Sequence, residues 1–276
     1  MTPIMTQLIS LLLQGLRLTA IAVAIFMAVL FFAQRYLIFP APREPLPNPL
    51  PADVTRIELG QTYGLFLNAA KTEHDRRPLI IFAHGNAECA HHWIDSFRWY
   101  REQGISVLLL EFPGYAAAGG SPSFDSLREA VLSGYDTMVA RADIDPAAVI
   151  AYGRSIGGGP IGLLAEERPV AALILESSFA SLKDLVYHHR NPGFLLRDRF
   201  DNGPIVAALE IPVLLVHGTQ DRIIPIKFAH QLRDLAADAT FHELACDHNN
   251  CPPPLSYVRK FLHEKTAIRL AENPDG

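Results

Sequence analysis

The chain has 276 residues and a formal net charge of −5, with 49% apolar and 19% charged residues. This length suits one large domain plus a short extra segment, and is small for two full domains. A net acidic chain without a clustered basic excess lacks the surface that binds a phosphate backbone, so we expect no nucleic-acid partner. Three cysteines are too few, and odd in number, to indicate a disulfide framework.

Residues 1–39 are predicted to form an N-terminal transmembrane anchor. The run from Leu18 to Gln34 reads LTAIAVAIFMAVLFFAQ and contains no charged residue. About 20 apolar residues span a bilayer core. The run reaches that length at Phe39 if Arg35 extends its charged end to the interface. We therefore expect a single-pass membrane protein.

Two other interpretations of this segment remain open. A buried core helix would show a polar face, which this run lacks. A cleaved signal peptide would begin with basic residues, but the first basic residue is Arg17, and the small-x-small run at 22–24 lies inside the apolar stretch. Arg35 and Arg43 follow the helix, so the positive-inside rule favours a cytoplasmic location for the domain that follows.

Residues 40–52, PAPREPLPNPLPA, contain six prolines. Proline restricts the backbone and removes a hydrogen-bond donor, so this segment is predicted to be an extended linker that holds the domain away from the membrane. Residues 53–276 then form one predicted α/β domain.

The domain alternates short apolar runs with helix-like stretches. Runs that are apolar throughout are typical of strands buried on both faces, as in parallel sheets. The predicted strands are Leu79–Ala83, Val107–Leu110, Val149–Tyr152, Ala172–Leu175, Val213–Val216 and Thr240–Leu244, after an antiparallel hairpin of Thr55–Leu59 and Leu65–Asn68. The predicted helices cover 89–103, 123–141, 157–168 and 226–237. This alternation predicts an α/β fold, a mostly parallel sheet with helices on both faces, whose site lies at the carboxyl ends of the strands.

A nucleophile elbow is predicted at residues 153–157, GRSIG, which has the form G-x-S-x-G. The motif follows the strand Val149–Tyr152 and opens a helix, the context in which such an elbow projects a serine hydroxyl. Gly153 and Gly157 supply the room that strand and helix need where they approach. Ser155 is thus the candidate nucleophile, and a glycine-rich turn without chemistry is the alternative.

An oxyanion hole is predicted beside it. Acyl transfer builds negative charge on a carbonyl oxygen, which two fixed N–H donors can stabilise. One donor would be the backbone N–H of Ile156, and the other that of Asn86 or Ala87, after the strand Leu79–Ala83. The alternative is an ordinary turn in which His84 is a core residue.

His248 is the candidate general base. In sites built around such a nucleophile elbow, the catalytic residues follow one another along the chain in the order serine, acid, histidine. His248 lies in the loop after the last predicted strand. Among the other late histidines, His217 directly ends a strand, His230 lies on a predicted helix and His242 lies on a predicted strand. His263 also lies late in the chain.

Asp221 is the candidate acid, because it follows the strand Val213–Val216 and precedes His248. It would orient the imidazole and stabilise the imidazolium. Glu176, after the strand Ala172–Leu175, is the rival, and a structural ion pair is the alternative for either carboxylate.

Several segments together resemble the Bem46-like α/β-hydrolases, a group that includes membrane-anchored depalmitoylating hydrolases. The resemblance covers roughly residues 55–262 and rests on HGNAE, EFPGYAAAGGSPS, YGRSIGGGP, LILESSFASLKDL, RFDN and IPVLLVHGTQDRIIP. It implies the α/β-hydrolase fold, a Ser155, Asp221 and His248 triad, and an N-terminal anchor. One departure is Asp247, where the family commonly has glycine before the catalytic histidine.

The expected chemistry is hydrolysis of a carboxylic ester or thioester through an acyl-enzyme, with no metal or organic cofactor. His91 and His92 are adjacent on a predicted helix and diverge, so they make a poor metal pair. A small lid at 177–210, with an apolar wall from Val186, Tyr187 and residues 194–196, suits small-molecule or acylated, lipid-like substrates. A serine peptidase with the same triad and a non-catalytic membrane-bound binding protein are the other candidate functions.

Cys246 and Cys251 flank His248. We expect two free buried thiols. A disulfide is the alternative, and it would require an oxidising compartment and argue against a cytoplasmic domain.

Overall fold

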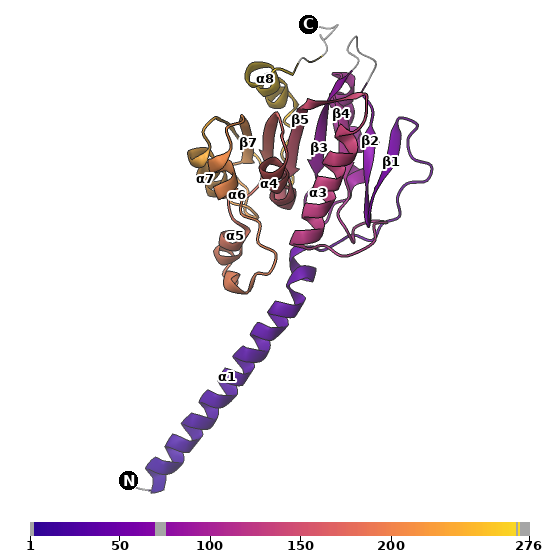
Figure 1. Ribbon diagram of the computed structural model, residues 1–276. Helices are drawn as coiled ribbons and strands as arrows, with labels where there is room; N and C mark the ends of the chain where they lie inside the picture. The colour runs from indigo at the N-terminus through magenta and orange to yellow at the C-terminus, as the bar shows by residue number, and fades with distance from the viewer. Residues whose placement is uncertain (1–2, 70–75, 269, 271–276) are drawn as a thin grey trace.

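The computed structural model describes residues 3–69, 76–268 and 270. The outer ends of the predicted anchor and domain, residues 1–2 and 271–276, lie outside the described residues. A long helix, α1 (Pro3–Ile38), extends from a layered α/β domain (Figure 1).

The domain is built on one eight-stranded sheet of order β1-β2-β4-β3-β5-β6-β7-β8. The first two pairings, β1 with β2 and β2 with β4, are antiparallel, and every later pairing is parallel. The strands are β1 (Val54–Leu59), β2 (Thr62–Leu67), β3 (Arg77–Ala83), β4 (Ser106–Leu110), β5 (Ile144–Arg154), β6 (Ala172–Glu176), β7 (Val213–Gly218) and β8 (Ala239–Leu244). The predicted hairpin, the mostly parallel sheet and the α/β-hydrolase fold class are confirmed.

Helices cover both faces of this sheet. The helical segments are η1 (Ala90–Trp93), α2 (Ile94–Glu102), α3 (Phe124–Val139), η2 (Ser155–Gly157), α4 (Gly158–Glu167), α5 (Leu182–His188), η3 (Gly193–Leu195), α6 (Asn202–Ala208), α7 (Lys227–Leu235) and α8 (Leu255–Lys265). Core residues of α3, α4, α6 and α7 pack together on one side, and those of α2 and α8 pack on the other. The central strands β3, β4, β6 and β7 are largely apolar because both of their faces are buried. The short elements α5 and η3 lie in the segment 177–210, where the small lid is predicted, and α6 ends that segment against the core.

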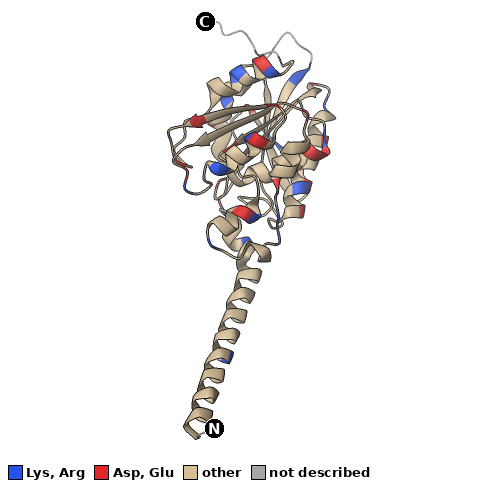
Figure 2. Ribbon diagram, turned by 90° about the vertical axis from the view of Figure 1, so that its left-hand side faces the viewer, with Lys and Arg blue, Asp and Glu red and all other residues tan. Residues whose placement is uncertain are grey.

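Helix α1 is long and apolar enough to cross a membrane. Its most apolar window has a mean hydropathy of 2.4, and none of that window is buried in the domain. Figure 2 shows it almost free of charge along its length, in contrast to the domain. Its final turn is different, because Gln34 is buried and Arg35 forms an ion pair with Asp198.

The proline-rich segment 40–52, which is predicted to be an extended linker, lies along the domain. Phe39 is buried in the domain core, and Leu46 and Leu50 pack against the opposite core cluster. The backbone carbonyl of Pro42 accepts a hydrogen bond from the N–H of Ala116, at 2.8 Å. The prolines keep the segment extended, but its apolar side chains bury themselves along the domain, so the helix end lies directly against the fold.

Candidate active site

Ser155 lies at a sharp turn between β5 and α4. Its φ is 53°, in the left-handed region that non-glycine residues seldom adopt. A Cβ at Gly153 would lie 2.6 Å from the Cα of Gly158, and one at Gly157 would overlap the backbone of Ala83. The glycines of the G-x-S-x-G motif are therefore required by the close approach of strand and helix, and the strained serine has the geometry of a nucleophile elbow.

The three residues predicted as a triad meet at the carboxyl ends of β5, β7 and β8. His248 Nε2 lies 2.9 Å from Ser155 Oγ, and His248 Nδ1 lies 2.6 Å from Asp221 Oδ2. All three side chains are buried. The imidazole can therefore accept the serine proton at one nitrogen while the carboxylate fixes its other nitrogen as the N–H donor.

The loop after β7 holds Asp221 as an anion. Its Oδ1 accepts hydrogen bonds from the backbone N–H groups of Ile223 and Ile224, at 2.9 and 2.7 Å. Burial alone would raise the pKa of Asp221, but contacts with His217 and His248 outweigh it and hold the pKa below its ordinary value. His217 Nε2 also lies 2.7 Å from the carbonyl of Ile224, in the same loop.

The loop after β3 carries the predicted oxyanion donors. Among the described residues, no backbone hydrogen bond outside the helices and strands involves the N–H of Asn86 or Ala87. The Asn86 side chain is fixed at both ends, because its Nδ2 donates to the carbonyl of Ile38 at 2.6 Å and its Oδ1 accepts from the Tyr115 hydroxyl at 2.8 Å. Ala87 has a φ of 56°, so the backbone turns sharply there. His84 is buried and paired with Glu111 at 3.0 Å, as a core histidine.

Arg154, which sequence reasoning passed over, connects three parts of the site. It pairs with Glu88, and it donates to the backbone carbonyl of His248 at 2.9 Å. Glu88 in turn accepts from the N–H of Gly85, at 2.7 Å, in the loop after β3. A charged residue at the end of a buried strand, next to the nucleophile, was the signal that could have revealed this role.

Glu176, the rival acid, is placed away from the imidazole hydrogen bonds. It accepts from the Tyr152 hydroxyl and lies 3.7 Å from Arg154. Burial raises its pKa, which Arg154 opposes. Glu176 therefore belongs to the buried ion-pair network behind the site.

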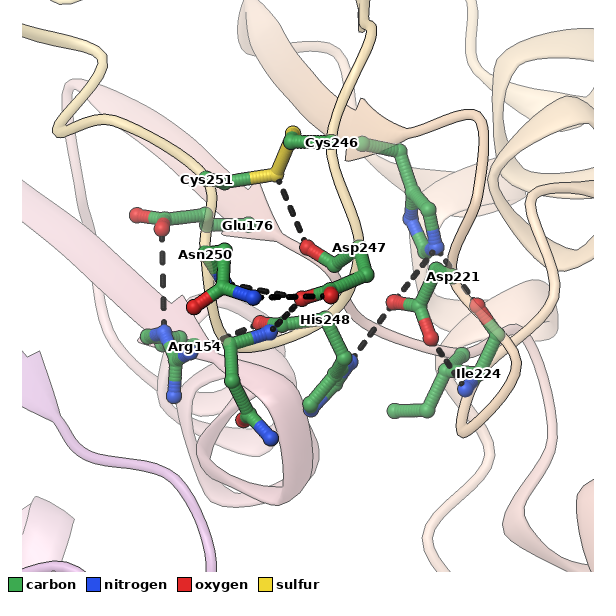
Figure 3. The surroundings of a disulfide bond; sticks show 11 residues. Arg154, Glu176, Asp221, Ile224, Cys246, Asp247, His248, Asn250 and Cys251 are labelled. Carbon is green, nitrogen blue, oxygen red and sulfur yellow. Dashed lines mark hydrogen bonds and ion pairs between the residues drawn. A yellow bond between two sulfur atoms is a disulfide. The ribbon is translucent and has the colours of Figure 1, made fainter.

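The loop that carries His248 is closed by a disulfide between Cys246 and Cys251 (Figure 3). The expectation of two free thiols is therefore wrong: the turn from 247 to 250 returns the chain so that the two Cα atoms lie 5.1 Å apart, within bonding range. Asp247 accepts from the N–H groups of Asn249 and Asn250, both at 2.9 Å. The residue that departs from the family pattern thus orders this turn.

Two other features surround the site. A cleft of about 740 Å³ opens over His248 and is lined mainly by polar residues of the loops at 219–223 and 247–250. The potential ligand atoms of Cys89, His91 and His92 lie within 4.8 Å of one another. However, burial raises the pKa of the Cys89 thiol to about 12, and His92 is already bonded to Glu44 at 2.9 Å. We base no part of the candidate site on this group.

The chain is similar to several curated proteins, although no protein-family model matches it. It is 30% identical over 165 residues to the YfhR protein of Escherichia coli O157:H7, a match that covers 58% of each chain. It is 28% identical over 244 residues to the Bem46 protein of Schizosaccharomyces pombe, covering 80% of this chain and 82% of the relative. The match thus spans a little over half of the YfhR length and most of Bem46.

Solved structures share the fold. The Est1E protein of Butyrivibrio proteoclasticus, solved with ferulic acid bound, superposes with a TM-score of 0.63 at 17% identity, covering 76% of this chain and 98% of Est1E. The acylaminoacyl peptidase of Pyrococcus horikoshii gives a TM-score of 0.62 at 14% identity, covering 80% of this chain and 42% of the peptidase. The shared fold and the sequence relatives together confirm the likeness to the Bem46-like α/β-hydrolases that the motifs predict.

Proposed function

We propose that this protein is a membrane-anchored serine hydrolase that cleaves a carboxylic ester or thioester. The observation that carries the proposal is the hydrogen-bonded chain Asp221–His248–Ser155, with the serine on a strained elbow. Such a chain activates a hydroxyl that is otherwise a weak nucleophile at neutral pH.

The reaction proceeds in two steps. His248 takes the proton of Ser155 as its Oγ bonds to the acyl carbon, and returns that proton to the leaving alcohol or thiol as the old bond breaks. Water then attacks the acyl-enzyme with His248 again as base, and the acid leaves while Ser155 regains its proton. The N–H groups of Ile156 and of Asn86 or Ala87 stabilise the oxyanion in both steps.

We further propose that α1 is the anchor and that the catalytic domain faces an oxidising compartment. The disulfide beside His248 supports this side of the membrane, because such bonds persist in oxidising compartments. This proposed location replaces the cytoplasmic location that Arg35 and Arg43 favoured. Labelling of an introduced surface cysteine by an impermeant maleimide on intact cells tests the placement, and protection until lysis would contradict it.

The experiment for the activity uses purified protein in detergent with p-nitrophenyl butyrate, S-butyryl thiocholine and a matched anilide. We expect turnover of the ester and thioester, lost in Ser155→Ala, and little turnover of the anilide. Cleavage of the anilide at a comparable rate would favour a peptidase. Equal ester turnover by the parent and by Ser155→Ala would contradict the proposal.

A further inference from the structure

A cavity of about 210 Å³ lies between the last turns of α1 and the lid. It is smaller than the ~300–1,000 Å³ typical of sites for drug-sized ligands, and so suits a slender occupant. Its walls are largely aliphatic and come from two segments far apart in the sequence, namely Leu30, Leu37 and Ile38 from α1 and Val186, Leu195 and Leu196 from the lid.

Polar contacts hold the two walls together. Gln34 Nε2 donates to the carbonyl of Leu195 at 3.1 Å, and Gln34 Oε1 accepts from the N–H of Arg197 at 2.7 Å. The next residue of the helix, Arg35, forms a bidentate ion pair with the buried Asp198, at 2.7 and 2.9 Å. The cavity is therefore a built feature in which the helix is fixed against the lid.

The inner end of the cavity adjoins the predicted oxyanion loop. Ile38, which lines the cavity, accepts the hydrogen bond of the Asn86 side chain. This bond joins one lining residue of the cavity to the loop that is predicted to hold the oxyanion.

The outer wall of the cavity belongs to the segment predicted to enter the membrane. Leu30 lies within the apolar run of α1, and Figure 1 shows this helix leaving the domain at the end where α5 lies. The lid exposes Tyr187 and Phe194, and the Arg197 guanidinium lies 5.4 Å from the ring centre of Phe31. The same region of the lid therefore contacts the helix and presents apolar side chains outward.

We infer that this cavity is the acyl-chain subsite and that the anchor helix forms one of its walls. Its occupant is a long, unbranched acyl chain that enters from the bilayer, carried either by a lipid ester or by an acylated protein. The inference rests on the proposed function and adds that the helix takes part in substrate recognition besides attachment. It predicts that chain-length preference depends on residues of α1.

The test fills the cavity from each wall, with Leu30→Trp and Val186→Trp, in full-length protein in detergent. We expect kcat/KM for p-nitrophenyl dodecanoate to fall about tenfold in both variants, while kcat/KM for p-nitrophenyl butyrate stays within about twofold of the parent, because a lost apolar contact of this size costs 10–200-fold. Leu16→Trp, at an exposed position on the same helix, is the matched control and should change neither value. Unchanged dodecanoate kinetics in both cavity variants would overturn the subsite.

Two further measurements keep the outcomes distinct. Hydrolysis of p-nitrophenyl butyrate by the variants shows that their triad is intact. If the parent protein hydrolyses neither the butyrate nor the dodecanoate ester, the proposed function itself is contradicted. Parallel assays with a monoacylglycerol in mixed micelles and with an S-palmitoyl peptide identify the carrier of the chain. Sensitivity of either substrate to Leu30→Trp supports the subsite, and insensitivity of both, with turnover intact, overturns it.

Discussion

Arg154 donates a hydrogen bond to the backbone carbonyl of His248, at 2.9 Å, from the position directly before the nucleophile. The same guanidinium pairs with Glu88, which fixes the N–H of Gly85 in the loop after β3. One buried side chain thus links the nucleophile turn, the histidine loop and the predicted oxyanion loop.

Replacing Arg154 with methionine should lower kcat about 100-fold, with a smaller change in KM, because a small misplacement of a catalytic group costs that much. Steady-state kinetics on p-nitrophenyl butyrate measure the two constants separately. Arg168→Met is the matched control, since Arg168 forms a similar pair with Asp136 at the surface. If Arg154→Met lowers the yield of folded protein but leaves kcat per active site normal, Arg154 serves folding alone. Partial recovery of kcat in Arg154→Lys supports a positioning role.

Asp221→Asn should keep the fold and lower kcat by about four orders of magnitude, because the amide would favour the wrong tautomer of the imidazole. Ester kinetics measure the fall in kcat, and circular dichroism checks that the fold is kept. Glu176→Gln is the informative comparison, because Glu176 contacts Arg154 and Tyr152. If Glu176→Gln lost more kcat than Asp221→Asn, the assignment of the acid would be wrong.

Stability should depend on pH through Asp221. Its pKa is lower in the folded protein than in the unfolded chain, so the ionised carboxylate stabilises the fold. That contribution is complete above the ordinary carboxyl pKa of about 3.9 and is lost as the pH falls toward the lower folded value. Urea unfolding of the parent at a series of acidic pH values should therefore show a steeper loss than that of Asp221→Asn. An equal loss of stability on acidification in the two proteins would refute a contribution from ionised Asp221.

The disulfide predicts a defined pattern of thiol reactivity. Denatured, unreduced protein should take up one iodoacetamide label, at Cys89, and reduced protein should take up three. The double variant Cys246→Ser with Cys251→Ser should lose about 2 kcal/mol of unfolding free energy, from the short loop that the bond closes. Three labels without reduction would mean that the thiols are free.

The docked end of α1 should contribute to stability. Asp198→Asn removes the charge that pairs with Arg35, and we expect a loss of about 1–2 kcal/mol, because one partner is partly exposed to solvent. Thermal unfolding in detergent measures this. Asp136→Asn, which breaks a pair of the same geometry at the surface, should cost less. Equal losses in the two variants would show that the docking adds nothing.

The sequence was informative where chemistry imposes a local pattern. The apolar strands, the G-x-S-x-G turn, and the order of Ser155, Asp221 and His248 all depend on spacing along the chain, and the structure brings these residues together. The small lid also followed from the length left between two strands.

What the sequence did not reveal depends on contacts between distant segments. The pair of Arg35 with Asp198 joins residues 163 positions apart, and no local pattern predicts it. The proline-rich segment suggested a spacer, but Leu46 and Leu50 found partners on the domain. The link from Arg154 to the His248 loop and the closure of the disulfide likewise required the folded chain.

The most direct measurement is covalent labelling of detergent-solubilised protein by a fluorophosphonate probe, followed by mass spectrometry of the labelled peptide. The hydrogen-bonded chain from Asp221 to Ser155 predicts one adduct, on Ser155, which is absent in Ser155→Ala and strongly reduced in His248→Ala. Folded parent protein that takes up no probe, or an adduct on another residue that persists in Ser155→Ala, would contradict a serine hydrolase with this triad.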